Sequence, residues 1–211
     1  MSTESRERDQ LSRGIAALGL GNEARTIDLQ LEYVEQLRKW NRVYNLVSAS
    51  DLSDVVCRHL LDSLSIHSWL LPGSLLDVGT GAGFPGLPLA IARPEMNCTL
   101  LDSVGKKVRF LRHIKRTLEI ENIHPHESRV SDYSSEGGFN NIVSRAFRSL
   151  TEFASEVRHL ANRDTRLLAM KGRHPAEELQ GLPQWLEVVS VEKIDVPDLH
   201  AERHLVIMSV S

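Results

Sequence analysis

The chain has 211 residues, of which 41% are hydrophobic and 25% are charged, and its formal net charge at pH 7 is −3. This composition excludes a disordered chain, a collagen-like repeat and a small disulfide scaffold. The slightly acidic balance also excludes nucleic-acid binding through overall charge, so an RNA partner would have to contact one local basic face. The length predicts one full domain with an added segment.

The first 70 residues are predicted to be helical. Apolar residues recur at three- and four-residue steps from Thr26 to Val47, with charged residues between them. The predicted helices, with Ser50 as the cap of the last one, run over Gln10–Leu18, Thr26–Val47 and Asp51–Trp69. We expect residues 1–72 to form a helical extension packed on a core domain at residues 73–211, so that the two parts make a single compact unit.

Short apolar runs separated by longer spacers begin at Ser74. Seven strands are predicted, at Leu75–Val78, Cys98–Leu101, His124–Glu127, Ile142–Ser144, Leu167–Met170, Val188–Val191 and Leu205–Val210. The spacers are long enough for crossover helices, which predicts a doubly wound α/β fold with a mostly parallel sheet. A short loop joins the last two runs, so we expect an antiparallel pair at the end of the sheet.

A glycine-rich turn follows the first predicted strand. Gly79, Gly81 and Gly83 permit a tight turn and let a ligand approach the backbone. The turn lies at the carboxyl end of a parallel strand, where open α/β sheets bind ligands. The pattern GxGxxG at residues 81–86 is by itself a weak signal that several nucleotide-binding folds share.

Two carboxylates narrow the choice of ligand. Asp77 precedes the glycines, where it would repel a diphosphate but attract an ammonium group. Asp102 ends the second strand, where an acid can accept both hydroxyls of a ribose. Together the loop and its acids favour S-adenosylmethionine, although a purely structural turn and a dinucleotide site stay open.

The residue after the fourth strand limits the acceptor of a methyl group. The motif Asp/Asn-Pro-Pro-aromatic, common in methylation of exocyclic amines, is replaced by Ser144-Arg145-Ala146-Phe147, and neither cysteine has the proline neighbour typical of cytosine-carbon methylation. Arg145 can hold a carboxylate, a phosphate or the O6/N7 edge of guanine. Guanine N7 already carries a lone pair, so its methylation needs alignment and no general base.

Metal, export and membrane signals are weak or missing in the sequence. Cys57 and Cys98 lie far apart with no zinc-site spacing, and His124 and His126 lack a third ligand, so we predict no metal. Charges occupy the N-terminal region where a signal peptide would be apolar, and no apolar run reaches about 18 residues. We expect a cytoplasmic protein, with a monomer as the default state.

Several segments together resemble the RsmG (GidB) family. They are Trp40-Asn41 with Asn45-Leu46, the run RHLLDSL at residues 58–64, the loop DVGTGAGFPG at residues 77–86, Asn141 to Ala146, Met170-Lys171-Gly172 and Glu202 to Leu205. The resemblance covers nearly the whole chain. It implies a Rossmann-like class I S-adenosylmethionine-dependent methyltransferase, with a seven-stranded sheet and a helical extension, that methylates a guanine N7 of bacterial 16S ribosomal RNA.

The resemblance also implies cofactor contacts at five positions, Gly79, Phe84, Val130, Ser131 and Arg145. Ser131 replaces the glutamate usual in the family, so adenine recognition there would rely on backbone groups and Val130. With the loop and its acids included, the expected cofactor site comprises Asp77, Gly79, Gly81, Gly83, Phe84, Asp102, Val130, Ser131 and Arg145.

Basic residues suggest where RNA would bind. Arg109 and Arg112 belong to a predicted helix on the cofactor side of the sheet, and the others near the substrate mouth are Lys171, Arg173 and Arg203. For each, a solvated surface is the competing interpretation. A further polar group, Arg58, His59 and Asp62, is expected to tie the extension to the core as a structural network.

The predicted partner is 16S ribosomal RNA within a small-subunit particle. Two other functions stay open from the residues: methylation of a small metabolite, and a non-catalytic assembly factor that binds the cofactor. No side chain is assigned as a general base.

Overall fold

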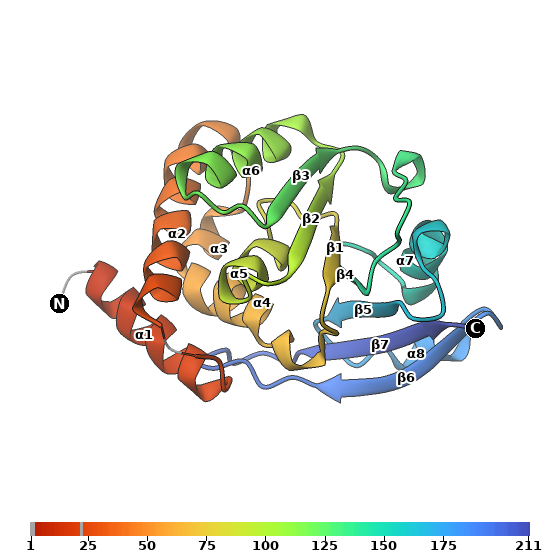
Figure 1. Ribbon diagram of the computed structural model, residues 1–211. Helices are drawn as coiled ribbons and strands as arrows, with labels where there is room; N and C mark the ends of the chain where they lie inside the picture. Colours follow the sequence, from red (N-terminus) through yellow and green to blue (C-terminus); the bar gives the residue numbers. More distant parts are fainter. Residues whose placement is uncertain (1–2, 22) are drawn as a thin grey trace.

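The structure is a computed structural model that describes residues 3–21 and 23–211 (Figure 1). Its centre is a seven-stranded sheet with the order β3-β2-β1-β4-β5-β7-β6. The strands are β1 (Ser74–Val78), β2 (Asn97–Asp102), β3 (Ile123–Glu127), β4 (Asn141–Ser144), β5 (Arg166–Lys171), β6 (Leu186–Lys193) and β7 (His204–Val210). β1 to β5 run parallel, and β7 is antiparallel to β5 and β6. The predicted sheet is confirmed.

Helices cover both faces of this sheet (Figure 1). The first face is covered by α1 (Thr3–Ala17), α2 (Ala24–Tyr44), α5 (Gly86–Ala92) and α6 (Gly105–Thr117), and the second by α7 (Leu150–Val157) and α8 (Ala176–Gln180). Leu75 and Leu76 on β1 therefore point to opposite faces and are both completely buried. Such burial on both sides is typical of parallel sheets.

The long amphipathic helix predicted near the N-terminus is α2. Its buried residues include Ile27, Tyr33 and Leu37, and they belong to the same hydrophobic cluster as Leu100 of β2. The helix ends where Asn45 adopts a left-handed conformation with φ 46° and ψ 61°. Asparagine tolerates this conformation better than most residues do, which explains why the helix stops before the predicted end at Val47.

The prediction of one continuous second helix over Asp51–Trp69 is wrong. The chain instead forms α3 (Ala49–Ser53), a π-helical segment (Val56–Leu61), α4 (Asp62–Leu64) and a 3-10 turn (His67–Trp69). The N-cap is Ser48 in place of Ser50, and its side chain accepts a hydrogen bond from the Asp51 amide. All residues of the π-helical segment except Arg58 are buried, so packing on several sides overrides the 3.6-residue period.

The spacer between β3 and β4 also differs from expectation. Within it, the described residues form only a 3-10 turn (Val130–Asp132) and irregular chain, so the crossover helix expected there is absent. The spacer contains Ser134, Ser135, Gly137 and Gly138, which lack the apolar spacing that a packed helix needs. This irregular chain leaves the carboxyl ends of β1 and β2 open to a ligand.

Among the helices of the described part of the chain, none combines the length and the apolar character needed to cross a bilayer.

Candidate active site

The glycine loop after β1 has the backbone shape that its sequence predicts. Gly79, Gly81 and Gly83 all have positive φ, at 70°, 64° and 120°. A Cβ at Gly79 would also lie 2.8 Å from the Cβ of Ala146, which follows β4. Residue 79 therefore has to be glycine both for its conformation and for the close approach of the two strand ends.

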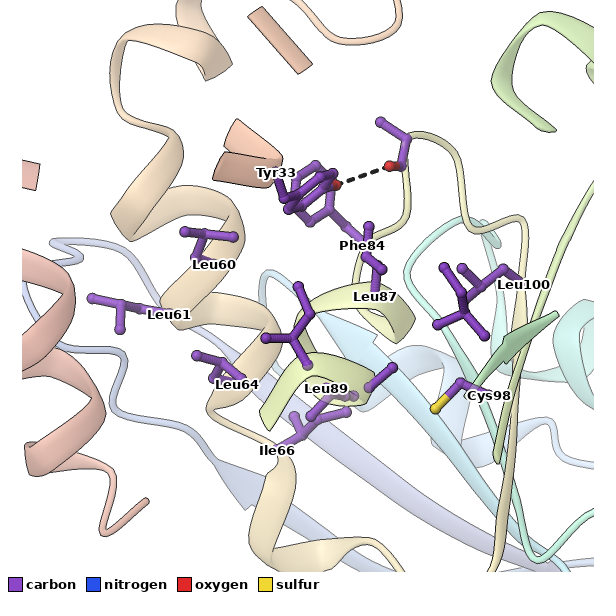
Figure 2. Packing of buried hydrophobic residues seen from close by; sticks show 14 of the residues in the cluster. Tyr33, Leu60, Leu61, Leu64, Ile66, Phe84, Leu87, Leu89, Cys98 and Leu100 are labelled. Carbon is purple, nitrogen blue, oxygen red and sulfur yellow. Dashed lines mark hydrogen bonds between the residues drawn. The ribbon is translucent and has the colours of Figure 1, made fainter. Parts of the chain in front are cut away.

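Helix α2 of the helical extension contacts this loop and the start of α5 through two side chains. The Tyr33 hydroxyl of α2 donates a 2.8 Å hydrogen bond to the carbonyl of Ala82, and the Tyr33 ring lies 5.5 Å from that of Phe84 (Figure 2). The Gln30 side-chain amide donates a 2.9 Å bond to the carbonyl of Pro88. Sequence reasoning missed both residues, although Tyr33 lies four residues from Leu29 and from Leu37, which places all three on one helix face.

Asp77 is completely buried beneath the loop. Its Oδ2 accepts hydrogen bonds from the Thr80 hydroxyl at 2.6 Å and from the Gly86 amide at 2.8 Å. Its Oδ1 has no hydrogen-bond partner among the described residues. Burial raises the pKa of Asp77 to about 6, against the opposing effect of the Thr80 and Gly86 hydrogen bonds. The side chain thus fixes the loop with one oxygen, while the other oxygen is buried without a hydrogen bond from any described residue.

Asp102 ends β2 and faces the same region. It accepts hydrogen bonds from the amides of Gly81 and Val104, both at 2.9 Å, and its Oδ2 lies 3.4 Å from the Lys107 ammonium. The side chain is nearly buried. Because a carboxylate offers about four acceptor positions, Asp102 keeps capacity for a ligand hydroxyl.

A cleft of about 610 Å³ opens beside these groups, at the carboxyl ends of β1 to β4. Its lining residues are Val78, Gly79, Leu101, Asp102, Ser103, Val104, Lys107, Ser128, Arg129, Val130, Ser131, Ala146, Phe147, Arg148, Glu152 and Glu156. The volume suits a nucleoside-sized ligand. Four of the predicted cofactor residues, Gly79, Asp102, Val130 and Ser131, therefore line one cleft.

The other predicted cofactor residues do not line this cleft. Asp77, Gly81 and Gly83 belong to the loop and the strand beneath it, whereas Phe84 and Arg145 lie together in a second group. The Ser131 hydroxyl bonds to the Asp132 carboxylate at 3.0 Å, so Asp132 stands beside the residue that replaces the family glutamate.

The second group, here called the Asp62 cluster, consists of His59, Asp62, Phe84, Arg145 and Arg203. Asp62 Oδ1 accepts a 2.9 Å hydrogen bond from Arg203 Nε, and Asp62 Oδ2 lies 3.2 Å from Arg145 Nη1. Arg145 Nη2 lies 3.1 Å from His59 Nδ1, and the His59 ring stacks on Phe84 with centroids 4.4 Å apart. The predicted polar network exists, except that Arg58 pairs with Asp54 outside the cluster.

His59 in this cluster is a neutral imidazole. Burial, reinforced by the charge of Arg145, lowers the pKa of His59 to about 4. A guanidinium only donates hydrogen bonds, so Nδ1 is the acceptor and the hydrogen lies on Nε2. Nε2 is buried without a partner in the described structure.

The basic residues predicted to contact RNA have different surroundings. Arg109 and Arg112 are exposed on α6, and Arg173 is exposed after β5. Lys171, in contrast, is engaged by both carboxylate oxygens of Glu178, at 2.9 and 3.1 Å, and by the carbonyl of Arg148. The described residues contain no group of side chains suited to a metal ion.

The strand order and the glycine loop between two acidic strand ends define the class of Rossmann-like methyltransferases. Within this class the chain belongs to the family described as rRNA small subunit methyltransferase G, whose sequence model matches residues 27–206. The family resemblance is therefore confirmed. The chain is 46% identical over 200 residues to the "Ribosomal RNA small subunit methyltransferase G" of Salmonella typhimurium, and the match covers 95% of this chain and 97% of that protein.

Solved structures with low sequence identity share the fold. A SAM-dependent methyltransferase from Aquifex aeolicus matches with a TM-score of 0.55 at 18% identity, covering 81% of this chain and 98% of that chain. The tRNA methyltransferase TrmK of B. subtilis matches with a TM-score of 0.58 at 8% identity, covering 71% of this chain and 65% of that chain. At these identities the likeness supports the fold alone.

Proposed function

We propose that this protein transfers the methyl group of S-adenosylmethionine to N7 of a guanine in 16S ribosomal RNA. The observation that carries the proposal is the cleft beside the glycine loop, with Asp102 on its wall and the buried Asp77 beneath the loop. The Salmonella relative, which matches this chain over nearly its whole length, is named as a methyltransferase of small-subunit ribosomal RNA.

The residues at the cleft and beneath its glycine loop fit each part of this donor. The charge of Asp77, buried beneath the loop, favours the cationic amino acid end, and Asp102 has acceptor capacity for a ribose hydroxyl. Val130 and Ser131 supply a wall for the adenine. When bound, the donor supplies an electrophilic methyl group on a positively charged sulfur.

The acceptor chemistry agrees with the absence of an assigned base. N7 of guanine needs no deprotonation, and His59 is neutral with Nδ1 already committed to Arg145. The contribution of the protein is therefore alignment of the two reactants, which is worth up to roughly 7–11 kcal/mol in favourable cases. The RNA is proposed to be presented in a small-subunit particle in the cytoplasm, where Cys57 and Cys98 stay as the free thiols found here.

The deciding experiment maps N7-methylguanine in small-subunit RNA from cells with and without the protein. We expect one modified guanine to disappear without it, and to return with the wild-type protein but not with Asp102→Ala, which loses the ribose contact. A soluble metabolite methylated in place of RNA would contradict the proposed acceptor. If neither the wild-type protein nor Asp102→Ala modified the RNA, and cells with Asp102→Ala assembled small subunits as well as cells with the wild type, the protein would be an assembly factor.

A further inference from the structure

A second hollow lies at the same edge of the sheet as the cofactor cleft. It has a volume of about 630 Å³ and is lined by Gly172, Arg173, Ala201, Glu202 and Arg203. These residues follow β5 and precede β7, which run in opposite directions and pair Lys171 with His204. The hollow therefore forms at the carboxyl end of β5, where the chain leaves one strand and enters the other.

The strand register places this hollow close to the reacting region. Ser144 at the end of β4 pairs with Ala169 of β5, so Arg145 lies level with Met170. Gly172 is two residues further out along β5, which corresponds to about 7 Å of extended chain. The separation between Arg145 and Gly172 is within the span of one nucleotide. A nucleotide whose base lies near Arg145 would therefore have its phosphate beside the hollow.

The guanidinium groups of the hollow are oriented but not saturated. Arg203 uses Nε for Asp62 at 2.9 Å and Nη1 for the carbonyl of Glu202 at 2.8 Å, which leaves three of its five N–H groups free. Arg173 is exposed and has no hydrogen bond or ion pair within residues 3–21 and 23–211. With the groups that hold Arg203 included, three arginines (Arg145, Arg173 and Arg203) face two carboxylates (Asp62 and Glu202), which leaves a surplus of one positive charge.

Asp62 is what holds Arg203 in this orientation. Its carboxylate is only 3% exposed and divides its two oxygens between Arg203 and Arg145. It follows directly after the π-helical segment, and interruptions of this kind are frequent at functional sites. A buried ion pair of this kind adds little to the stability of a fold, because well-packed apolar side chains would stabilise it equally. Positioning of the two arginines is therefore the better explanation for Asp62.

We propose that this hollow binds a backbone phosphate of the RNA strand that carries the target guanine, through Arg173 and Arg203, with Asp62 as the positioning residue for Arg203. The inference rests on the proposed function for the identity of the strand. Paired guanidinium groups suit a phosphate because each can donate two parallel hydrogen bonds to it. The contact reads no sequence and places the strand so that its base reaches the cofactor cleft.

The test measures binding to the RNA of intact small ribosomal subunits from cells that lack the protein, over a range of salt concentrations. Arg173→Gln and Arg203→Gln are each expected to weaken binding about tenfold at low salt. Each should also reduce the slope of log affinity against log salt by about 0.7–0.9. The matched control is Arg163→Gln, which removes an exposed arginine before β5, at the opposite edge of the sheet, and should change neither quantity.

The role of Asp62 is tested through Arg203. Asp62→Asn should weaken RNA binding, and adding it to Arg203→Gln should cause no further loss, whereas a merely structural role would add its own effect. Arg203→Lys, which keeps the charge but not the Nε contact, serves as a second probe if Asp62→Asn fails to fold. It is expected to keep the salt slope of the wild type but to bind RNA more weakly, because Asp62 no longer orients the cation.

The outcomes separate this inference from the proposed function. Affinity of the Arg173→Gln variant for S-adenosylhomocysteine should equal that of the wild type, because Arg173 lies outside the cofactor cleft. Equal effects of Arg173→Gln and Arg163→Gln, or no effect of either, would overturn the phosphate site even if N7 methylation is found. Arginine-dependent RNA binding without methylation would retain the site and reject the proposed reaction.

Discussion

Asp77 is a buried carboxylate whose two oxygens have unequal surroundings, and its charge opposes folding of the empty protein. Its folded-state pKa of about 6 lies above the usual 3.8. Asp77 therefore favours folding while it is protonated, and this contribution is lost as the pH rises from about 4 through about 6. The loop is thus built around a negative charge that a cationic donor would compensate.

Asp77→Asn, which keeps the shape and removes the charge, should stabilise the empty protein by roughly 1–3 kcal/mol at pH 7.5. The gain should shrink as the pH falls from about 6 towards 4, and urea unfolding of both proteins at pH 4.5 and 7.5 measures it. Methyl transfer should nevertheless fall by about tenfold or more, because the attraction for the donor is lost. A stability difference that is the same at both pH values would contradict the assigned burial of the charge.

At the scale of elements, α2 acts as a support for the glycine loop. Tyr33→Phe removes the hydroxyl that bonds the Ala82 carbonyl and leaves that carbonyl without its partner, at a cost of about 1–3 kcal/mol. We expect a lower Tm and a severalfold weaker affinity for S-adenosylhomocysteine, measured by calorimetry. The control is Tyr44→Phe on the same helix, because Tyr44 is 37% exposed, and it should change neither value.

A second prediction concerns the exposed face of α6. Arg109 and Arg112 are exposed, whereas Phe110 and Leu111 between them are buried against the core. Reversing both arginines to glutamate should weaken RNA binding because it replaces attraction with repulsion of phosphates. Affinity for S-adenosylhomocysteine, measured in parallel, should not change; equal loss of both affinities would instead indicate damage to the fold.

The elements differ in how far sequence could predict them. The parallel strands were predictable because burial on both faces gives a continuous apolar run, and α2 was predictable because burial of one face gives an apolar stripe at helical spacing. The segment from Asp54 to Leu64 was not, because residues such as Cys57 and Leu60 are buried on a side that no single period describes. The loop, Asp77 and Asp102 were predictable because each follows from the local sequence at a strand end. The cluster of Asp62, Arg145 and Arg203 was not, because it depends on the packing of three segments that are distant in the sequence.

At the scale of the whole molecule, the extension and the sheet share one hydrophobic core. One cluster joins Leu11 of α1, Leu37 of α2 and Leu64 of α4 to Leu100 of β2. The division at residue 72 is therefore a change of local pattern in the sequence, with no corresponding gap in the packing. A shared core of this kind predicts cooperative unfolding of the entire chain.

Removal of residues 1–72 tests this directly. The remaining chain would expose the side of α5 that α2 and α4 cover, and it would lose Tyr33 from the loop and Asp62 from the cluster. We expect a full-length protein with one calorimetric transition and a shortened one that is aggregated or unfolded, because each buried leucine contributes about 1.5–3 kcal/mol. A shortened chain that unfolds cooperatively and binds S-adenosylhomocysteine would show that the methyltransferase domain has a core of its own.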